Sequence, residues 1–467
     1  MTGWTVAAMV AALVAAPTPQ LVDAAASAGG VHLHQHVPNP YVGAVGYRDA
    51  DWAARVGATA DGSEPGTAAR MRAVADEPTA IWLDSIAELA DLPRHLDAAV
   101  VQQRSARAPV VVTVVLHDIP NRDCWYDQHG ELTVAGNGLA RYRSEFVDPL
   151  VAILRRPRYA RLRVATVIEP RALVNQINHS GPRSDSTAAC SEAAQAGVYP
   201  AAIGYALQRL HELPQVYTYL DAGPVGQVGW PEPLAAMVRL VTDIAAATPA
   251  GTAGVDGFAT NVADYSPTVE PFLRQSPSTD PWFLWGSSFL EFSRYVDAGT
   301  FAAALRQELV AAGFPDRIGV LLDTSRNGWG GADRPTAPVG GPVFDGDAWV
   351  DKYRVDRRPT RYYNWCNQIG AGLGARPQAA PEPGVHAYAW LARPGESDGW
   401  GTRPAGSSWP PDGPYEPGCD PDNMVPCCRG AAWPSNALRG APPAREWHPE
   451  QLAQLVRNAY PPVVTGP

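Results

Sequence analysis

The chain has 467 residues and a formal net charge of −10, from 37 Lys and Arg residues against 47 Asp and Glu residues. This acidic balance argues against nucleic acid or any other polyanionic polymer as a partner. The length would accommodate two domains, but no linker or internal repeat divides the sequence, so we expect a single domain.

The first predicted element is an export signal. Val6–Ala16 is an apolar run of signal-peptide length, and Ala-x-Ala cleavage sequences follow at Ala24–Ala26 and Ala26–Ala28. We assign residues 1–28 to a signal peptide that is weak or truncated, because the first basic residue is Arg48. The run is too short to span a membrane, and no later segment offers a span. The sequence therefore predicts a secreted, extracellular protein.

Seven short, β-rich apolar runs follow, and nearly all of them end in a carboxylate or an amide. The predicted strands are Ala80–Asp84, Val110–Asp118, Val164–Glu169, Val216–Asp221, Gly254–Asn261, Arg317–Asp323 and Val385–Glu396. Between them, apolar residues recur at three- and four-residue spacing, which predicts helices. The clearest helical stretches are Leu139–Arg156, Ala201–Leu213, Pro233–Ala247 and Thr300–Ala312.

Alternating strands and helices predict a parallel sheet with helices outside it. Continuous apolar strands, such as residues 110–116, indicate burial on both faces. We predict an α/β fold: a distorted seven-stranded parallel β/α barrel in a single domain, with long loops at the carboxyl-terminal face, where such barrels carry their chemistry. An open doubly wound sheet is the alternative.

The six cysteines suit an oxidising compartment. Cys427 and Cys428 are adjacent, and no histidine stands at ligand spacing from them, so the sequence shows no zinc pattern and we predict no metal site. Spacing alone does not determine how the cysteines pair.

Seven sequence blocks, in order, carry a resemblance to a known family. They are Asp118–Cys124, Val167–Pro170, Tyr219–Gly223, Ala259–Ala263, Asp323–Trp329, Asn364–Gly370 and Pro394–Gly399. They resemble the signatures of glycoside hydrolase family 6, and especially its bacterial cellobiohydrolase-like branch. The similarity covers residues 39–462, and we expect no separate carbohydrate-binding module. Segments Asp323–Arg358 and Gly395–Cys419 resemble the loops that roof the cleft in that branch.

The resemblance implies a monomeric, inverting hydrolase of β-1,4-glucan or cello-oligosaccharides that uses no cofactor. Inversion needs a carboxylic acid that protonates the leaving oxygen and a carboxylate that assists the attacking water. Asp123 matches the carboxylate that raises the pKa of the acid, and Asp398 matches the proposed base. The matching sugar-binding positions are Trp82, Asp84, Arg122, Asp221, Trp230, Asn261, Trp365, Arg393 and Glu396. The family also implies disulfides Cys124–Cys190 and Cys366–Cys419, and it has no counterpart for Cys427 and Cys428.

The position of the acid, two residues after Glu169, is occupied by Arg171. A guanidinium stays protonated and releases no proton to a glycosidic oxygen. Loss of a general acid typically costs about 10² to 10⁴ in rate. We also expect that Arg171 can form a bidentate ion pair with Asp123.

Other departures from the family pattern gather near the same place. His117 replaces a tyrosine, the loop at residues 125–130 is one residue short and lacks a serine, and Pro224 and Gln227 replace a histidine and a stacking tryptophan. Arg393 stands in place of a lysine, which keeps the charge and changes the donor geometry.

Two function classes follow from these residues. The first is a secreted cellulose or β-glucan hydrolase, in which a substitute acid restores slow cleavage. Four residues are candidates for that acid: Glu169, His117, Asp127 and Asp185. The second class is a non-catalytic glucan-binding protein that kept the cleft and lost the acid.

Overall fold

A computed structural model describes residue 1 and residues 36–126, 130–275, 282–337, 345–362, 364–399, 417–426 and 432–466. The chain divides into two units, Met1–Leu33 and His34–Pro467, and the elements described below belong to the second. The predicted signal segment, Asp127, Cys427 and Cys428 lie outside the described residues.

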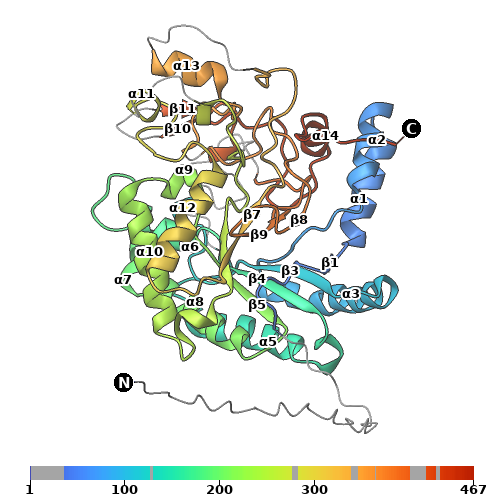
Figure 1. The fold of residues 1–467 in the computed structure, drawn as a ribbon, viewed down its shortest axis with the longest axis vertical. Helices are drawn as coiled ribbons and strands as arrows, with labels where there is room; N and C mark the ends of the chain where they lie inside the picture. Colours follow the sequence, from blue (N-terminus) through green and yellow to red (C-terminus); the bar gives the residue numbers. More distant parts are fainter. Residues whose placement is uncertain are drawn as a thin grey trace. The chain divides into compact units, whose positions relative to one another are not determined.

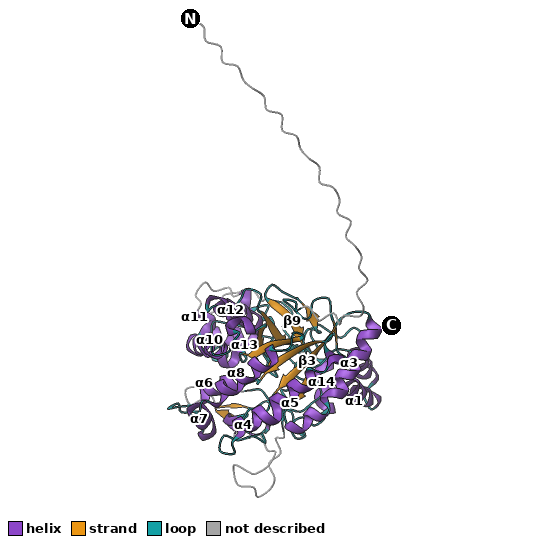
Figure 2. Cartoon of the chain, turned by 90° about the horizontal axis from the view of Figure 1, so that it is seen from below, coloured by secondary structure: helices purple, strands orange, loops and turns teal. Residues whose placement is uncertain are grey.

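Seven parallel strands form the centre of the fold, with helices around them (Figures 1 and 2). The strands are β2 (Ile81–Leu83), β3 (Val110–Leu116), β4 (Arg163–Ile168), β5 (Val216–Asp221), β6 (Gly257–Thr260), β7 (Gly319–Asp323) and β9 (Val385–Ala389). They pair in chain order from β2 to β9. One parallel bridge between Thr79 and Trp390 joins the two ends of the row. The prediction of a distorted seven-stranded β/α barrel is confirmed, and the open sheet is excluded.

Four shorter strands lack a counterpart in the sequence prediction. They are β1 (Val45–Gly46), β8 (Gln378–Ala379), β10 (Met424–Pro426) and β11 (Ala432–Pro434). β1 shares the edge of β3 with β2, β8 pairs antiparallel with β9, and β10 and β11 form a separate hairpin. At two or three residues each, they are too short to show a periodicity in the sequence.

The α-helices among the described residues are α1 (Ala50–Asp61), α2 (Pro65–Val74), α3 (Leu92–Ala106), α4 (Gly138–Arg141), α5 (Asp148–Leu154), α6 (Ala172–His179), α7 (Ala188–Gln195), α8 (Val198–His211), α9 (Val225–Val228), α10 (Pro231–Ala246), α11 (Trp282–Trp285), α12 (Ala298–Ala311), α13 (Gly346–Tyr353) and α14 (Pro449–Arg457). The predicted helices at 201–213, 233–247 and 300–312 correspond to α8, α10 and α12. The stretch predicted as one helix at 139–156 contains a π-helical turn, Tyr142–Val147, between α4 and α5. No helix among the described residues is long and apolar enough to cross a membrane.

Side chains of each central strand alternate between two cores. In β3, Val110, Val112 and Val114 pack against the surrounding helices, whereas Val111 and Val115 face the barrel interior. The interior is filled by the large rings of Tyr217 and Tyr219 together with small residues such as Ala165, Ala259 and Ala387. This two-sided burial explains why the strands appear as continuous apolar runs in the sequence.

The last predicted strand is shorter than expected. It was predicted to extend to Glu396, but β9 ends at Ala389. Beyond it, the backbone N–H groups of Leu391 and Ala392 donate to the carboxylate of Asp323, at 3.2 and 3.0 Å. A side chain therefore replaces the neighbouring strand as the hydrogen-bond partner, and the chain leaves the sheet to form the rim.

Candidate functional site

A cavity of about 210 Å³ opens at the carboxyl-terminal ends of the strands. Its lining includes most of the residues that the sequence singles out. These are Trp82, Asp84, Arg122, Asp123, Arg171, Trp365, Arg393, Glu396 and Asp398, with His117, Arg326 and Arg445 beside them. The predicted positions thus come together from β2, β3, β4 and the loops that follow β7 and β9.

Several residues at this rim have left-handed backbone. Asp123, Glu169, Arg171 and Ala263 have φ between 50° and 66°. This conformation is uncommon for residues other than glycine, and such strain gathers at functional sites. Asp adopts it more readily than Arg does, so the backbone at position 171 suits an aspartate better than the residue present.

Arg171 is the N-cap residue of helix α6. Its backbone N–H donates to Asp221 at 2.9 Å, and its Nη2 donates to the Ala263 carbonyl at 3.2 Å. The guanidinium carbon lies 5.5 Å from the ring centroid of Trp365. Among the described residues no ion pair joins Arg171 to Asp123, so the predicted bidentate pair is wrong. The guanidinium contacts Ala263 and Trp365 instead.

Asp123 lies against two other basic side chains. Its Oδ2 is 3.6 Å from Nε of Arg122 and 3.7 Å from Nε2 of His117. Arg122 also donates to the backbone carbonyls of Asp84 and His117, which fixes its position. Burial lowers the pKa of His117 to about 4, so the imidazole is neutral near pH 7.

Asp398 is held by three donors. Arg326 pairs with its Oδ1, while the Tyr265 hydroxyl and the Asn367 N–H each donate to Oδ2 at 2.7 Å. The Asp398 side chain is 9% exposed and that of Arg326 is 1% exposed. The Arg326 guanidinium and the two other donors therefore fix the position of the Asp398 carboxylate at the cavity wall.

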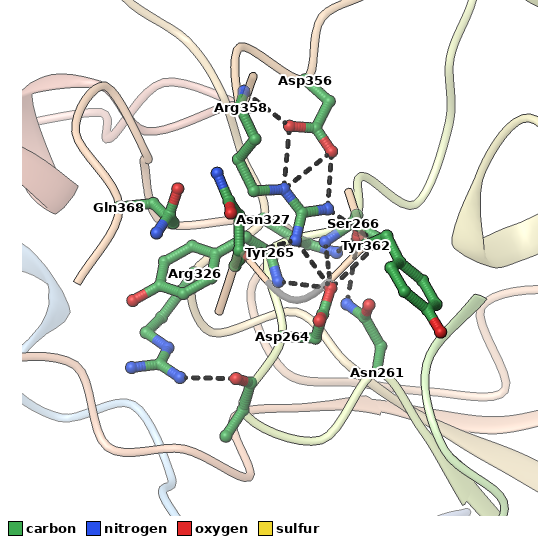
Figure 3. A network of polar contacts seen from close by, with 12 residues as sticks. Asn261, Asp264, Tyr265, Ser266, Arg326, Asn327, Asp356, Arg358, Tyr362 and Gln368 are labelled. Atoms are coloured by element: carbon green, nitrogen blue, oxygen red, sulfur yellow. Dashed lines mark hydrogen bonds and ion pairs between the residues drawn. The ribbon is translucent and has the colours of Figure 1, made fainter. Parts of the chain in front are cut away.

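The Arg326 pair belongs to a wider buried network. Figure 3 shows Arg358 between Asp356 and Asp264, with Ser266, Asn327 and Tyr265 around it. Arg358 Nη2 is 2.6 Å from Asp356 Oδ2, and its Nη1 is 3.3 Å from Asp264 Oδ1. This network anchors the segment that delivers Arg326 to the cavity.

A third cluster surrounds Trp82. Arg445 lies over the ring at 5.4 Å, the edge of His117 approaches at 5.3 Å, and the indole N–H donates to the Leu391 carbonyl at 2.7 Å. Asp84 pairs with Arg445 at 3.3 Å. Burial opposes the charge of Asp84, but Arg445, a hydrogen bond with Glu88, and Arg122 together lower its pKa to about 2.

Glu396 completes the lining through two ion pairs. It lies 3.2 Å from Arg393 and 3.5 Å from Arg445. Arg393 also reaches Asp49 at 3.0 Å and donates to the Ala80 carbonyl. These contacts connect the rim after β9 to the segment before β2.

Two predicted sugar-binding positions, Asp221 and Asn261, lie outside the described cavity lining. Asp221 accepts the backbone N–H groups of Arg171 and Gly223, and Asn261 donates to the carbonyls of Ser266 and Asp323. Both side chains are buried. In this structure they organise the loops that carry the cavity residues.

Trp230 lines a second cavity, of about 660 Å³, together with Gln227, Asp185, Tyr362 and other residues. Its indole N–H donates to the Glu291 carbonyl at 2.7 Å, and its ring meets Tyr362 edge to face at 5.7 Å. Asp185, one of the proposed substitute acids, therefore lines a different cavity from Asp123 and Asp398.

Glu169, another proposed substitute acid, is 1% exposed and absent from the lining of the first cavity. Its carboxylate accepts from the N–H groups of Asp118 and Ile119, at 3.3 and 3.1 Å, and from the Tyr142 hydroxyl at 2.8 Å. Burial raises its pKa to about 7. Through these contacts Glu169 ties the ends of β3 and β4 together.

Sequence reasoning missed two cavity arginines. Arg326 lies inside a recognised block, Asp323–Trp329, but no feature of that block points to Asp398, 72 residues further on. Arg445 lies outside every block and reaches Asp84, Glu88 and Glu396 from a loop before α14. The only sequence feature that could have pointed to Arg445 is its position in the Pro-rich stretch that follows the last recognised block.

Both disulfides implied by the resemblance are present. Cys124 pairs with Cys190, and Cys366 pairs with Cys419. The first fixes the chain next to Asp123, and the second fixes the chain next to Trp365.

Comparisons with known proteins agree with this geometry. Residues 43–459 match the glycosyl hydrolases family 6. Exoglucanase A of Cellulomonas fimi is 41% identical over 447 residues, which cover 91% of this chain and 49% of that protein. The chain thus spans about half the length of this relative. A probable 1,4-β-D-glucan cellobiohydrolase C of Aspergillus fumigatus is 32% identical over 428 residues, covering 91% of this chain and 78% of that protein.

Solved structures show the same fold. The catalytic domain of Cellulomonas fimi Cel6B is 40% identical, with a TM-score of 0.85, and the match covers 93% of this chain and 98% of that one. Cellobiohydrolase II of Humicola insolens, in complex with glucose and cellotetraose, is 27% identical, with a TM-score of 0.68 over 91% of this chain and 99% of that one. From its sequence, its barrel and these relatives, the chain belongs to glycosyl hydrolases family 6.

Proposed function

We propose that the protein binds β-1,4-glucan chains in the first cavity and that acid-catalysed cleavage is lost. One observation carries the proposal: the guanidinium of Arg171 lines the cavity at the end of β4, where the family pattern puts the acid. The side chains retained around it supply stacking surfaces, through Trp82 and Trp365, and hydrogen-bonding groups for sugar hydroxyls.

The carboxylates of the cavity support the loss of cleavage. Each one in the described lining has a guanidinium partner within 4 Å: Asp84 with Arg445, Asp123 with Arg122, Glu396 with Arg393, and Asp398 with Arg326. A nearby cation favours the ionised carboxylate, whereas a general acid must hold its proton until the leaving oxygen takes it. For Asp84, these interactions lower the pKa to about 2, so this carboxylate has no proton to donate near pH 7.

The test is to measure binding and cleavage of cellohexaose by the same wild-type preparation. We expect calorimetric binding at pH 7, with no soluble products after incubation for days. The α-linked isomer maltohexaose serves as the control ligand. Rapid release of cellobiose at pH 7 would contradict the loss of catalysis, and failure to bind cellohexaose would contradict the glucan proposal itself.

Slow hydrolysis with His117 as the acid is a second candidate, because its Nε2 lies 3.7 Å from Asp123 in the cavity. Its pKa of about 4 means that the protonated form prevails only below that pH. Cleavage by this route should therefore fall about tenfold for each pH unit above 4 to 5, and His117→Tyr should abolish it. A pH-independent rate between 5 and 7 would exclude His117.

We also propose that the protein acts outside the cell as a monomer. The two disulfides support an oxidising compartment. Detection of the chain in the culture medium, and a single light-scattering peak near the 49.8 kDa chain mass, are the expected results.

A further inference from the structure

Five guanidiniums line the first cavity: those of Arg122, Arg171, Arg326, Arg393 and Arg445. Arg122, Arg326, Arg393 and Arg445 each have a carboxylate within 4 Å. Within the part of the chain that the structure describes, Arg171 makes no such ion pair.

The contacts of Arg171 are neutral or lie on its backbone side. Its guanidinium has the Ala263 carbonyl at 3.2 Å and the face of Trp365 at 5.5 Å. The Arg171 guanidinium also interacts electrostatically with two carboxylates, Asp221 and Asp264, but both carboxylates have other partners. Asp221 accepts backbone N–H groups, and Asp264 pairs with Arg358.

A half-buried guanidinium that opens onto a cavity favours an anionic partner. Partial burial weakens its hydration, and its planar fork matches a carboxylate with two parallel hydrogen bonds. The surrounding surface is suited to sugar rings, because Trp365 lies beside Arg171 and Trp82 lines the same cavity. The two features together describe a ligand that is both a saccharide and an anion.

We propose that the cavity binds a β-linked oligosaccharide that carries a carboxylate, and that this carboxylate pairs with Arg171. The inference rests on the glucan binding proposed above and names the ligand class of that site. The carboxylate has two chemical sources: an aldonate at an oxidised chain end, or a uronate within the chain.

Calorimetry with three tetrasaccharides at pH 7 and low ionic strength tests the proposal. They are cellotetraose, its reducing-end aldonate, and a β-1,4-linked oligomer of glucuronic acid. A charge-assisted hydrogen bond predicts that wild type binds one of the two acidic ligands at least about tenfold more tightly than cellotetraose. The acidic ligand that is preferred identifies the source. The preference should shrink in 0.5 M NaCl as the charges are screened.

Variants assign the effect to the residue. Arg171→Gln should remove the preference, so that its affinities for the acidic ligand and for cellotetraose differ by less than about threefold, whereas Arg171→Lys should retain part of the preference, because lysine keeps the charge but not the fork. Arg183→Gln is the matched control, since Arg183 is exposed, pairs with Glu232 and lines the second cavity. It should behave as wild type. Thermal melts of every variant identify any that fail to fold.

Three results would overturn the inference. Equal wild-type affinity for all three ligands would show that the cavity does not recognise the carboxylate, and the glucan proposal would be unaffected. If the Arg171→Gln variant still prefers the acidic ligand over cellotetraose, a basic side chain other than Arg171 binds the carboxylate. Binding of none of the three ligands overturns both proposals together.

Discussion

At the scale of single residues, Trp365 is the clearest candidate for a sugar-stacking platform in the first cavity. Its ring is half-buried beside Arg171, and the neighbouring Cys366–Cys419 disulfide fixes its backbone. A large aromatic ring offers a rigid apolar face at low entropic cost, and loss of such an anchor commonly costs about 2 kcal/mol or more in binding.

We therefore expect Trp365→Ala to weaken cellotetraose binding by about 30-fold, as measured by calorimetry. Trp282→Ala is the control, because Trp282 is 62% exposed and lies outside the linings of both cavities. Its affinity should match that of wild type. Equal affinities for all three proteins would show that glucan does not stack on Trp365.

The sequence predicted which residues line the cavity better than it predicted which of them form ion pairs. Asp123 and Asp398 were recognised because each lies in a block with a fixed order along the chain, and Trp82 was recognised as a match to the family pattern outside those blocks. Arg326 and Arg445 were missed because an ion pair between distant loops leaves no local pattern. The contacts of the Arg171 guanidinium were also missed. They depend on where Ala263 and Trp365 lie in the folded chain and not on the strand that precedes Arg171.

At the scale of elements, the junction of β3 and β4 depends on Glu169. The carboxylate receives two N–H groups that follow β3 and the hydroxyl of Tyr142 in the π-helical turn. Burial raises its pKa to about 7, above its usual value near 4.5. Between these two values the unfolded chain releases the proton while the folded chain retains it. The contribution of this group to stability is therefore complete below about pH 4.5 and is lost as the pH rises through 7.

Glu169→Gln should flatten this dependence. An amide keeps the hydrogen-bond acceptor and has no proton to lose, so the difference in unfolding free energy between pH 5 and pH 8 should shrink by about 2 to 3 kcal/mol. Urea unfolding of both proteins at the two pH values measures it. Buried histidines with lowered pKa, such as His386, tilt the profile in the opposite direction but are common to both proteins. Parallel profiles would contradict the assignment.

The Cys124–Cys190 disulfide joins the loop after β3 to helix α7 across 66 residues. Closing a loop of this length stabilises the fold by about 4 kcal/mol in the chain-entropy account. The double substitution to alanine should lower the unfolding free energy by about that amount. It should also weaken cellotetraose binding, since Arg122 and Asp123 immediately precede Cys124. A stable double variant with unchanged affinity would show that the loop is held by other contacts.

The strands that the sequence predicted correctly are those that are buried along their whole length. The seven central strands were located because both of their faces are apolar, while β1, β8 and the β10–β11 hairpin are too short to show a pattern. The end of β9 was misplaced because the Asp323 carboxylate replaces a strand partner there, and such a substitution depends on the closed barrel.

At the scale of the whole molecule, the barrel depends on contacts between segments that lie far apart in the sequence. The bridge between Thr79 and Trp390, which joins the two ends of the strand row, is an example. A ligand that binds only the closed barrel stabilises the folded chain by about 2.7 kcal/mol at a concentration of 100 Kd. For a domain of this size that corresponds to a rise in Tm of about 3 °C. Differential scanning calorimetry with cellotetraose should show this rise, and maltotetraose should leave Tm unchanged. Identical melts with the two sugars would contradict selective β-glucan binding.

Among the departures from the family pattern, we propose that Arg171 by itself accounts for the loss of cleavage. Arg171→Asp restores a carboxylic acid at a position whose left-handed backbone suits aspartate, so the variant should fold. Release of soluble sugars from amorphous cellulose and cellohexaose is the direct measurement, with Arg171→Asn as the matched control. The aspartate variant should cleave at least about 10² times faster than wild type and the asparagine variant. Equal, negligible rates in all three proteins, with cellohexaose still bound, would show that changes around His117 and Gln227 have altered the site as well.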